Sequence, residues 1–458
     1  MRKLLQYDTS LLTLETPQGT LSLSKLFLPM FAEMLLLNTM GTINTLMLSH
    51  YSDDAVAAVG AASQLLGMIL TFYTVISTGA SIVINHNLGA GNQKNASDAA
   101  FSSIVFCGAI SFAMGIVLSA AAKPILGLMH LEEQVLDYAV TYFRIVMSFS
   151  FFQAITSSIS GIFRSYGKPK ISVTVSVAMN LFVAILDYLI IFRPLELPLK
   201  GVSGIATAYV LSELFGLLII LAFLVKVPLG LKLHEKNLKT LLIVKDILRV
   251  GIPGGISSIS YNVSQVVSTS IIAILGTTAI STKIYVSNIV FYVYVFGMTL
   301  GLSVSLMIGW MAGAGKYEQA YRLNLQSLKI TITANIFFSV IVCFLAKPLL
   351  GCFTDDPVII ASGQALMFID IFVEIGRGFN HIEENSLRGA GDVVFPMVVS
   401  IISCWVMSIL FSYLLGIQFG FGLAGCWIAF GMDEFFRGIT YFFRWRSRKW
   451  TTKTVHTP

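Results

Sequence analysis

The chain has 458 residues, of which 55% are apolar and only 12% are charged, whereas soluble domains carry about 25% charged residues. Apolar stretches of about 20 residues or more recur, which is the length an α-helix needs to cross a hydrocarbon core of about 30 Å. These features exclude an ordinary soluble protein and predict an all-α membrane protein, since β-barrel strands would be short and alternating. The net charge of +6 does not indicate nucleic-acid binding, because the basic residues lie in short loops between apolar spans.

The two halves of the chain repeat one another. Adding 224 to Pro29 gives Pro253, and the same step carries the sequence Gly-Ala-Gly at 89–91 to its copy at 313–315. Near the end of each half the step shortens slightly to 221. A period held through separated landmarks indicates a duplicated structural unit.

Six membrane spans are predicted in each half, hence twelve transmembrane helices in two parallel six-helix repeats. They lie at about 21–48, 55–88, 97–122, 135–160, 171–192, 201–225, 247–275, 279–311, 321–346, 358–387, 394–416 and 423–443. Lys and Arg favour one side by about four to one, which places both termini in the cytoplasm. Parallel repeats of this kind are typical of transporters that alternate access around a central cavity.

The spans define a domain organisation that alternates lobes with basic cytoplasmic segments. The predicted parts are a cytoplasmic N-terminal leader at 1–20, an N-lobe with spans one to six at 21–225, a basic cytoplasmic connector at 226–246, a C-lobe with spans seven to twelve at 247–443, and a basic cytoplasmic tail at 444–458.

Polar residues in the first and fifth spans predict an ion-coupling site in the N-lobe. Glu33 and Asn44 are eleven residues apart, and Asn180 and Asp187 are seven apart, so each pair can share one helix face. Ionisable groups at membrane depth are costly, and they are functional candidates for that reason. A desolvated carboxyl group can hold a proton, and an ionised one can bind Na⁺ together with amide and carbonyl oxygens. For Glu33, a structural role between helices is an equal alternative.

The tenth span is the most polar. Its candidate C-lobe network comprises Asp370, Glu374, Arg377, Asn380, His381 and Glu384. A structural ion pair between Glu374 and Arg377 is the favoured interpretation, because the two residues are three apart on one helix. His381 and Glu384 have a spacing that metal sites use, but two ligands are too few, so no metal site is predicted.

The seventh and eighth spans carry many polar and aromatic residues and almost no charge. The residues predicted to line a substrate cavity are Tyr261, Asn262, Gln265, Tyr285, Asn288 and Tyr292. The five cysteines are scattered, which favours free thiols over disulfides or a metal site. No cofactor and no enzymatic activity are expected, because no clustered catalytic constellation is found within the spans.

Several motifs together resemble the multidrug and toxic compound extrusion (MATE) family. They are Pro29 with GTINTLMLSHYSDDAVAAVGAASQL, the GAGN turn, FRSYGKPK with its copy LRGAGD, and the pair KGVSGIATA and FGLAGCWIA. The resemblance covers essentially the whole chain. It implies a V-shaped arrangement of two six-helix lobes, and a secondary antiporter that expels organic, often cationic, compounds in exchange for H⁺ or Na⁺.

The resemblance also bears on the coupling residues. Members of the family commonly use an aspartate in the first span, where this chain has Asn44, and one in the fifth span that matches Asp187. An amide cannot take up a proton, which suggests Glu33 as a replacement. Members that couple through the second lobe have an acid early in span seven, and this chain has none there, which favours coupling through the N-lobe.

The resulting prediction is an antiporter that exports amphipathic, cationic drugs or toxic compounds in exchange for H⁺, with Na⁺ as the alternative ion. A lipid-linked sugar flippase of the same superfamily is the main alternative, and a membrane-embedded enzyme is a weaker one. The expected partners are small organic substrates and the lipid bilayer, with no nucleic acid, and a monomer is expected. The predicted location is the cell inner (cytoplasmic) membrane, as a multi-pass protein.

Overall fold

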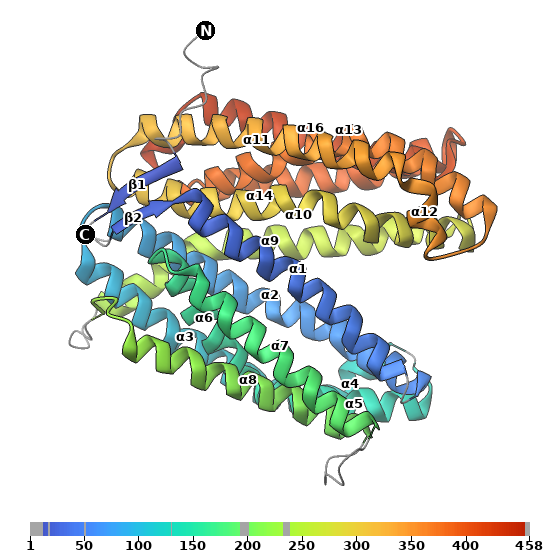
Figure 1. The fold of residues 1–458 in the computed structure, drawn as a ribbon, viewed down its shortest axis with the longest axis horizontal. Helices are drawn as coiled ribbons and strands as arrows, with labels where there is room; N and C mark the ends of the chain where they lie inside the picture. Colours follow the sequence, from blue (N-terminus) through green and yellow to red (C-terminus); the bar gives the residue numbers. More distant parts are fainter. Residues whose placement is uncertain are drawn as a thin grey trace. The chain divides into compact units, whose positions relative to one another are not determined.

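The structure, a computed structural model, describes residues 12–16, 19–49, 52–129, 131–192, 201–231 and 239–453. This part of the chain is almost entirely helical (Figure 1), which confirms the all-α fold class. Within it, one element was not predicted. An antiparallel hairpin of β1 (Thr13–Thr16) and β2 (Gly19–Ser22) precedes the first long helix, at the end of the predicted leader.

Helices follow one another with short connections. The long ones are α1 (Leu23–Ser49), α2 (Asp53–Gly89), α3 (Gln93–Ala120), α5 (Glu133–Ser148), α6 (Ser150–Ser165), α7 (Pro169–Phe192), α8 (Gly201–Lys226), α9 (Lys239–Ala273), α10 (Thr277–Gly313), α11 (Tyr317–Phe344), α13 (Pro357–Gly389), α14 (Val394–Ser403) and α16 (Gly422–Arg446). The shorter ones are α4 (Ala122–Gly127), α12 (Ala346–Gly351), the π-helical turns η3 (Cys404–Leu410) and η4 (Leu414–Gln418), α15 (Phe411–Tyr413) and the 3₁₀ turn η5 (Lys449–Thr452).

In the described part of the chain, nine helical stretches are long and apolar enough to cross a membrane. Helices α5 and α6 make a tenth span, bent by 51°. The bend lies at Phe149, whose backbone leaves the helical region (φ −117°, ψ 12°). The more polar helices α9 and α16 lie where the seventh and twelfth spans are predicted. Each of the twelve predicted spans therefore corresponds to a helical stretch.

The sequence repeat is reproduced by the helix boundaries. Helix α2 runs from Asp53 to Gly89 and α10 from Thr277 to Gly313, a shift of 224 at both ends. The pairs α3 with α11 and α4 with α12 are displaced by the same step at both ends. The turns after α2 and α10 each place a glycine at positive φ, Gly91 at 75° and Gly315 at 69°, a conformation that ends helices and that glycine adopts without steric cost.

The chain divides into two compact units, and their boundaries fall inside α1, α2 and α9. The N-lobe unit consists of Leu28–Ile84 and Asn92–Ile252, with the last two residues of the chain. The C-lobe unit consists of Met1–Phe27, Asn85–Gly91 and Pro253–His456. A third of the predicted basic connector, residues 232–238, lies outside the described residues, as does most of the predicted leader.

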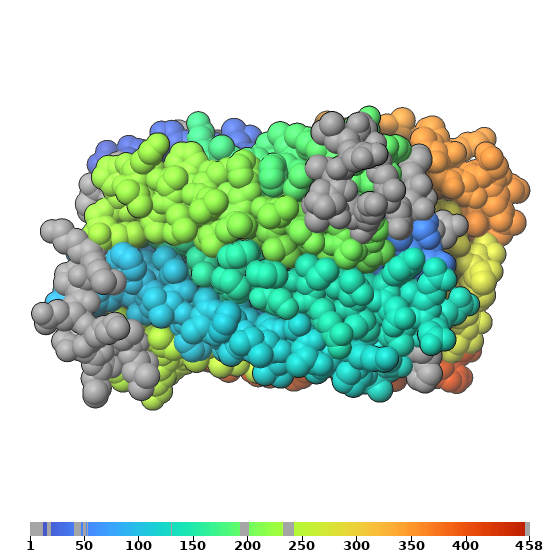
Figure 2. All heavy atoms as spheres, turned by 90° about the horizontal axis from the view of Figure 1, so that it is seen from below, coloured from blue at the N-terminus to red at the C-terminus, as the bar shows by residue number. Residues whose placement is uncertain are grey.

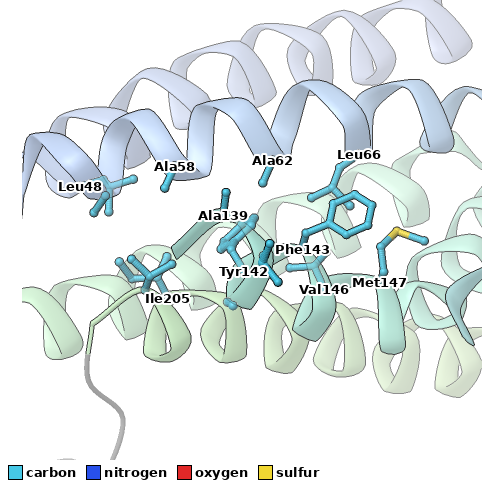
Figure 3. Close-up of a cluster of buried hydrophobic side chains, with 14 of the residues drawn as sticks. Leu48, Ala58, Ala62, Leu66, Ala139, Tyr142, Phe143, Val146, Met147 and Ile205 are labelled. Atoms are coloured by element: carbon cyan, nitrogen blue, oxygen red, sulfur yellow. The ribbon is translucent and has the colours of Figure 1, made fainter. Parts of the chain in front are cut away.

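In the N-lobe unit, α3, α5, α6 and α8 pack on one another, and Figure 2 shows them side by side across one face in cyan, teal and yellow-green. Figure 3 shows the apolar core between α2, α5 and α8. Ala58 and Ala62 of α2 lie there beside Ala139 and Phe143 of α5, and all four are fully buried. Small residues at such an interface let two helices approach closely.

In the C-lobe unit, α13 packs against both α10 and α16 (Figure 1). Glycines set the distance between α13 and α16. A Cβ added to Gly438 would lie 2.5 Å from the Cβ of Phe379, and one added to Gly376 would lie 2.9 Å from the ring of Phe435. This close crossing brings the polar residues of the two helices together.

Candidate functional site

Glu33 of α1 has partners on two other helices of the N-lobe unit. The hydroxyl of Ser176 on α7 donates a hydrogen bond of 2.6 Å to Glu33 Oε1. Arg164 Nη1, on α6, lies 3.9 Å from Glu33 Oε2. The carboxylate is 7% exposed. The acid is thus positioned by a short hydrogen bond and a longer ionic contact to two other helices.

A cavity open to solvent lies beside Glu33 between α1 and α7, with about 330 Å³ of space that includes open solvent. Its lining residues are Glu33, Leu36, Leu37, Met40, Ser176, Val177, Asn180 and Leu181. The structure thus brings the predicted site residues Glu33 and Asn180 to one cavity, where the Asn180 amide donates to the carbonyl of Ser176 at 2.8 Å. One carboxylate in an otherwise mostly apolar wall is suited to the charged end of a small amphipathic cation.

Asp187 lies further along α7, in the apolar core and not in this cavity. It is 5% exposed, and Val183 and Ile190 on the same helix belong to the buried cluster of Figure 3. Within the described part of the chain, Asp187 Oδ1 has no hydrogen-bond partner and Asp187 forms no ion pair. Tyr142 of α5, which Figure 3 shows in the cluster, interacts electrostatically with Asp187 and hydrogen-bonds Ser63.

A second buried acid lies in the same unit. Glu213 of α8 is 7% exposed, and its Oε2 has no hydrogen-bond partner in the described part of the chain. It interacts electrostatically with Tyr209 on the same helix. Tyr142 and Tyr209 interact electrostatically, so Asp187 and Glu213 are connected through two tyrosines. Sequence analysis missed Tyr142 because Asp187 lies on another helix, whereas Tyr209 is only four residues before Glu213 on α8.

The C-lobe unit contains a denser charged network around Arg377 of α13. Arg377 forms an ion pair with Glu374 on its own helix, and its Nε lies 3.6 Å from Glu434 of α16. Asn380 donates to Glu434 at 2.7 Å. Arg437 lies 3.3 Å from Glu434. The charges neutralise one another, which is what a buried ion network needs to be stable.

The remaining residues of the predicted C-lobe network have separate partners. Trp427 donates to Asp370 at 2.9 Å, and Arg388 pairs with Glu384 at 2.6 Å. His381 packs beside Tyr294, with ring centroids 6.1 Å apart. Groups of three or more potential metal ligands are not found in the described residues.

The predicted substrate-cavity residues lie on α9 and α10. Tyr261, Asn262, Asn288 and Tyr292 are exposed, and Gln265 and Tyr285 are half-buried. Arg437 lies over the ring of Tyr261, 5.9 Å from its centroid. These polar groups are thus accessible on the surface of the C-lobe unit. Asn44 lies on α1, but its side chain is outside the described part of the structure.

A polytopic helical bundle built as a repeat, with buried acids inside its spans, defines a membrane transporter. The sequence matches the MatE family over residues 29–189 and 253–414. The two matched segments begin at the repeated prolines Pro29 and Pro253. The chain belongs to this family, that of multidrug and toxic compound extrusion transporters.

Known relatives agree with this assignment. The uncharacterized transporter YisQ of Bacillus subtilis (strain 168) is 36% identical over 95% of this chain and 96% of its own length. The probable multidrug resistance protein NorM of Thermotoga maritima is 26% identical over 97% of this chain and 96% of its own. Both are similar from end to end, so the match includes both repeats.

Solved structures share the fold. A crystal structure of MATE in the bent conformation has a TM-score of 0.86 at 20% identity, covering 93% of this chain and 94% of that chain. A MOP superfamily transporter from Pyrococcus furiosus Vc1 also has a TM-score of 0.86 at 20% identity, covering 99% of both chains. The predicted two-lobe transporter fold is therefore confirmed.

Proposed function

We propose that this protein is a secondary active antiporter that exports amphipathic, cationic organic compounds in exchange for H⁺ by alternating access. The observation that carries this proposal is Asp187, a buried carboxyl group with an unpartnered oxygen in the apolar core of the N-lobe unit. An ionised carboxylate without a partner is costly in such surroundings. Asp187 therefore holds a proton until the core is hydrated or rearranged.

Proton exchange at Asp187 supplies the coupling step. Loss of the proton leaves a charge inside the core between α7, α5 and α2, and the packing there must change to accommodate it. Uptake of a proton restores the apolar packing shown in Figure 3. The two protonation states thus favour two arrangements of the N-lobe unit, as alternating access requires.

Glu33 is proposed to contact the substrate. In the cavity between α1 and α7, its carboxylate faces mostly apolar side chains, so an organic cation can place its charge at Glu33 and its body against Leu36, Met40 and Leu181. Arg164, at 3.9 Å, is the internal cation that the substrate would displace. A lipid-linked sugar flippase is less favoured, because the buried arginines Arg377 and Arg437 are paired with acids.

The relatives support this reading, since NorM of Thermotoga maritima is described as a probable multidrug resistance protein. The protein is proposed to act as a monomer in the cytoplasmic membrane, with both termini in the cytoplasm, because Lys and Arg gather in the segments predicted to be internal. It needs no cofactor beyond the coupling ion.

Reconstitution in liposomes tests the proposal. The purified protein is placed in vesicles with a fluorescent organic cation outside, and a pH gradient and a Na⁺ gradient are imposed separately. An acidic lumen alone should drive accumulation of the cation, with protons leaving as it enters. Accumulation that requires a Na⁺ gradient, or none under either gradient, would contradict H⁺ antiport.

A further inference from the structure

Glu383 of α13 is a buried acid without charge compensation in the C-lobe unit. Its side chain is fully buried, and it accepts one hydrogen bond, from Asn324 Nδ2 of α11 at 3.2 Å. Its other oxygen, Oε1, has no hydrogen-bond partner in the described part of the chain. The nearby acids Glu374, Glu384 and Glu434 each pair with an arginine.

The charged residues on the helices packed against α13 either have partners other than Glu383 or are exposed. On α10, Lys283 bonds Thr269. On α16, Arg437 pairs with Asp433 and Glu434, and Arg444 with Asp392. The remaining charged residues of α11, α12 and α16 are exposed, namely Glu318, Arg322, Lys329, Lys347 and Arg446. On α13 itself, Asp370 accepts a hydrogen bond from Trp427. Glu374 pairs with Arg377, and Glu384 pairs with Arg388. Neither arginine of α13 is therefore left to neutralise Glu383.

Other buried polar atoms of α11, the helix that contacts Glu383 through Asn324, also lack partners. Asn324 uses its amide nitrogen for Glu383 and, at 2.9 Å, for Ser386, but its Oδ1 is unpartnered. One turn along α11, the buried hydroxyl of Ser327 is unpartnered as well. Buried polar groups are normally hydrogen-bonded. The contact between Glu383 and Asn324 thus leaves one carboxylate oxygen and one amide oxygen without partners.

The sequence repeat shows that helix packing does not need these residues. Subtracting 224 carries Glu383 to Ile159 of α6, and Asn324 to Ala100 of α3. Helices α3 and α6 pack together as α11 and α13 do, and Ile159 and Ala100 are fully buried. An apolar pair therefore fills the same interface in the N-lobe unit, and the acid and amide of the C-lobe unit call for another explanation.

We propose that Glu383 is a second proton-carrying site, in the C-lobe unit. A proton adds to Oε1 of the carboxylate to give the neutral acid, and on release it returns to water without any other bond being made or broken. Asn324 positions the carboxyl group by its hydrogen bond to the other oxygen. Glu383 lies six residues before the end of α13, about 9 Å along the axis, on the side predicted to face the cytoplasm.

Infrared difference spectroscopy tests protonation directly. The purified full-length protein is compared at about pH 5 and about pH 9, without substrate, and the carbonyl stretch of protonated carboxyl groups is recorded. A band that is present in the wild type, absent in Glu383→Gln and retained in Glu133→Gln, an exposed acid, would establish the site. An unchanged band in Glu383→Gln would overturn it, and so would suppression of the band by Na⁺ at constant pH.

A second variant keeps the test decisive if Glu383→Gln does not fold. Asn324→Ala retains the acid but removes its hydrogen-bond donor, so the band should shift in frequency, and a band at the wild-type frequency would contradict the assignment. A role of Glu383 in transport rests on the antiport proposed above. In that mechanism, Glu383→Gln lowers the number of protons exchanged per substrate. The infrared result does not depend on transport, so failure of one claim is distinguishable from failure of the other.

Discussion

Ser176 donates a hydrogen bond of 2.6 Å to Glu33, and this contact joins α7 to α1 at the wall of the N-lobe cavity. The bond fixes the orientation of the carboxylate toward the cavity. It also ties the proposed substrate contact to α7, the helix that carries Asp187. A change at the proposed proton site can therefore reach the cavity through a single helix.

Replacing Glu33 should weaken the binding of organic cations. Glu33→Gln keeps the size and the hydrogen bond from Ser176 but removes the charge, and a charged contact of about 1.5–3 kcal/mol corresponds to a loss of affinity of about tenfold or more. Binding is measured by fluorescence polarisation or calorimetry in detergent. A neutral ligand of similar size serves as the control. Equal loss of affinity for both ligands would show that Glu33 does not recognise the charge of the cation.

Arg377 should be essential for the stability of the C-lobe unit. Arg377→Met leaves Glu374 and Glu434 buried without their shared cation, and breaking a buried pair costs about 3–5 kcal/mol. The variant should lower the melting temperature clearly in a thermal unfolding assay.

The matched comparison for Arg377 is an exposed ion pair in the same unit. Glu318 pairs with Arg448 at 2.7 Å and with Arg322 at 3.1 Å, and all three side chains are at least 52% exposed, so Glu318→Gln should cost about 1 kcal/mol or less. Equal destabilisation by Arg377→Met and Glu318→Gln would show that burial does not determine the strength of these pairs.

The close crossing of α13 and α16 predicts a strong effect of a single methyl group. Gly438→Ala would place a Cβ 2.5 Å from Phe379 Cβ and 2.9 Å from the backbone nitrogen of Asn380, so the helices must separate and the protein should lose thermal stability. Gly67→Ala on α2 has nothing within 4 Å of the added carbon and should be neutral or slightly stabilising. The reverse order of stabilities would contradict the packing described.

The repeat and the spans could be predicted from the sequence because both are periodic along the chain. Helices α2 and α10 follow the 224-residue step at both ends. The 51° bend between α5 and α6 was not predicted, because Phe149 carries no sequence signal such as proline or glycine.

A site residue could be predicted from the sequence where a charged group lies within an apolar span. It could not be predicted where the role depends on a partner on another helix. Asp187 stands out in an apolar span, and the structure buries it. The arginine near Glu33 is on another helix, more than a hundred residues away. Likewise, Asn324 and Glu383 are separated by 59 residues, and only the folded chain shows that they meet. Spacing within a helix cannot reveal such pairs.

The most direct test of the central claim is proton-driven uptake by Asp187→Asn in liposomes with an acidic lumen. The account predicts that this variant is inserted and folded normally but loses accumulation of the organic cation, since an amide cannot exchange a proton. Asp137→Asn, the same change at an exposed position of α5, should transport as the wild type does. Wild-type uptake by Asp187→Asn under the same pH gradient would contradict the account.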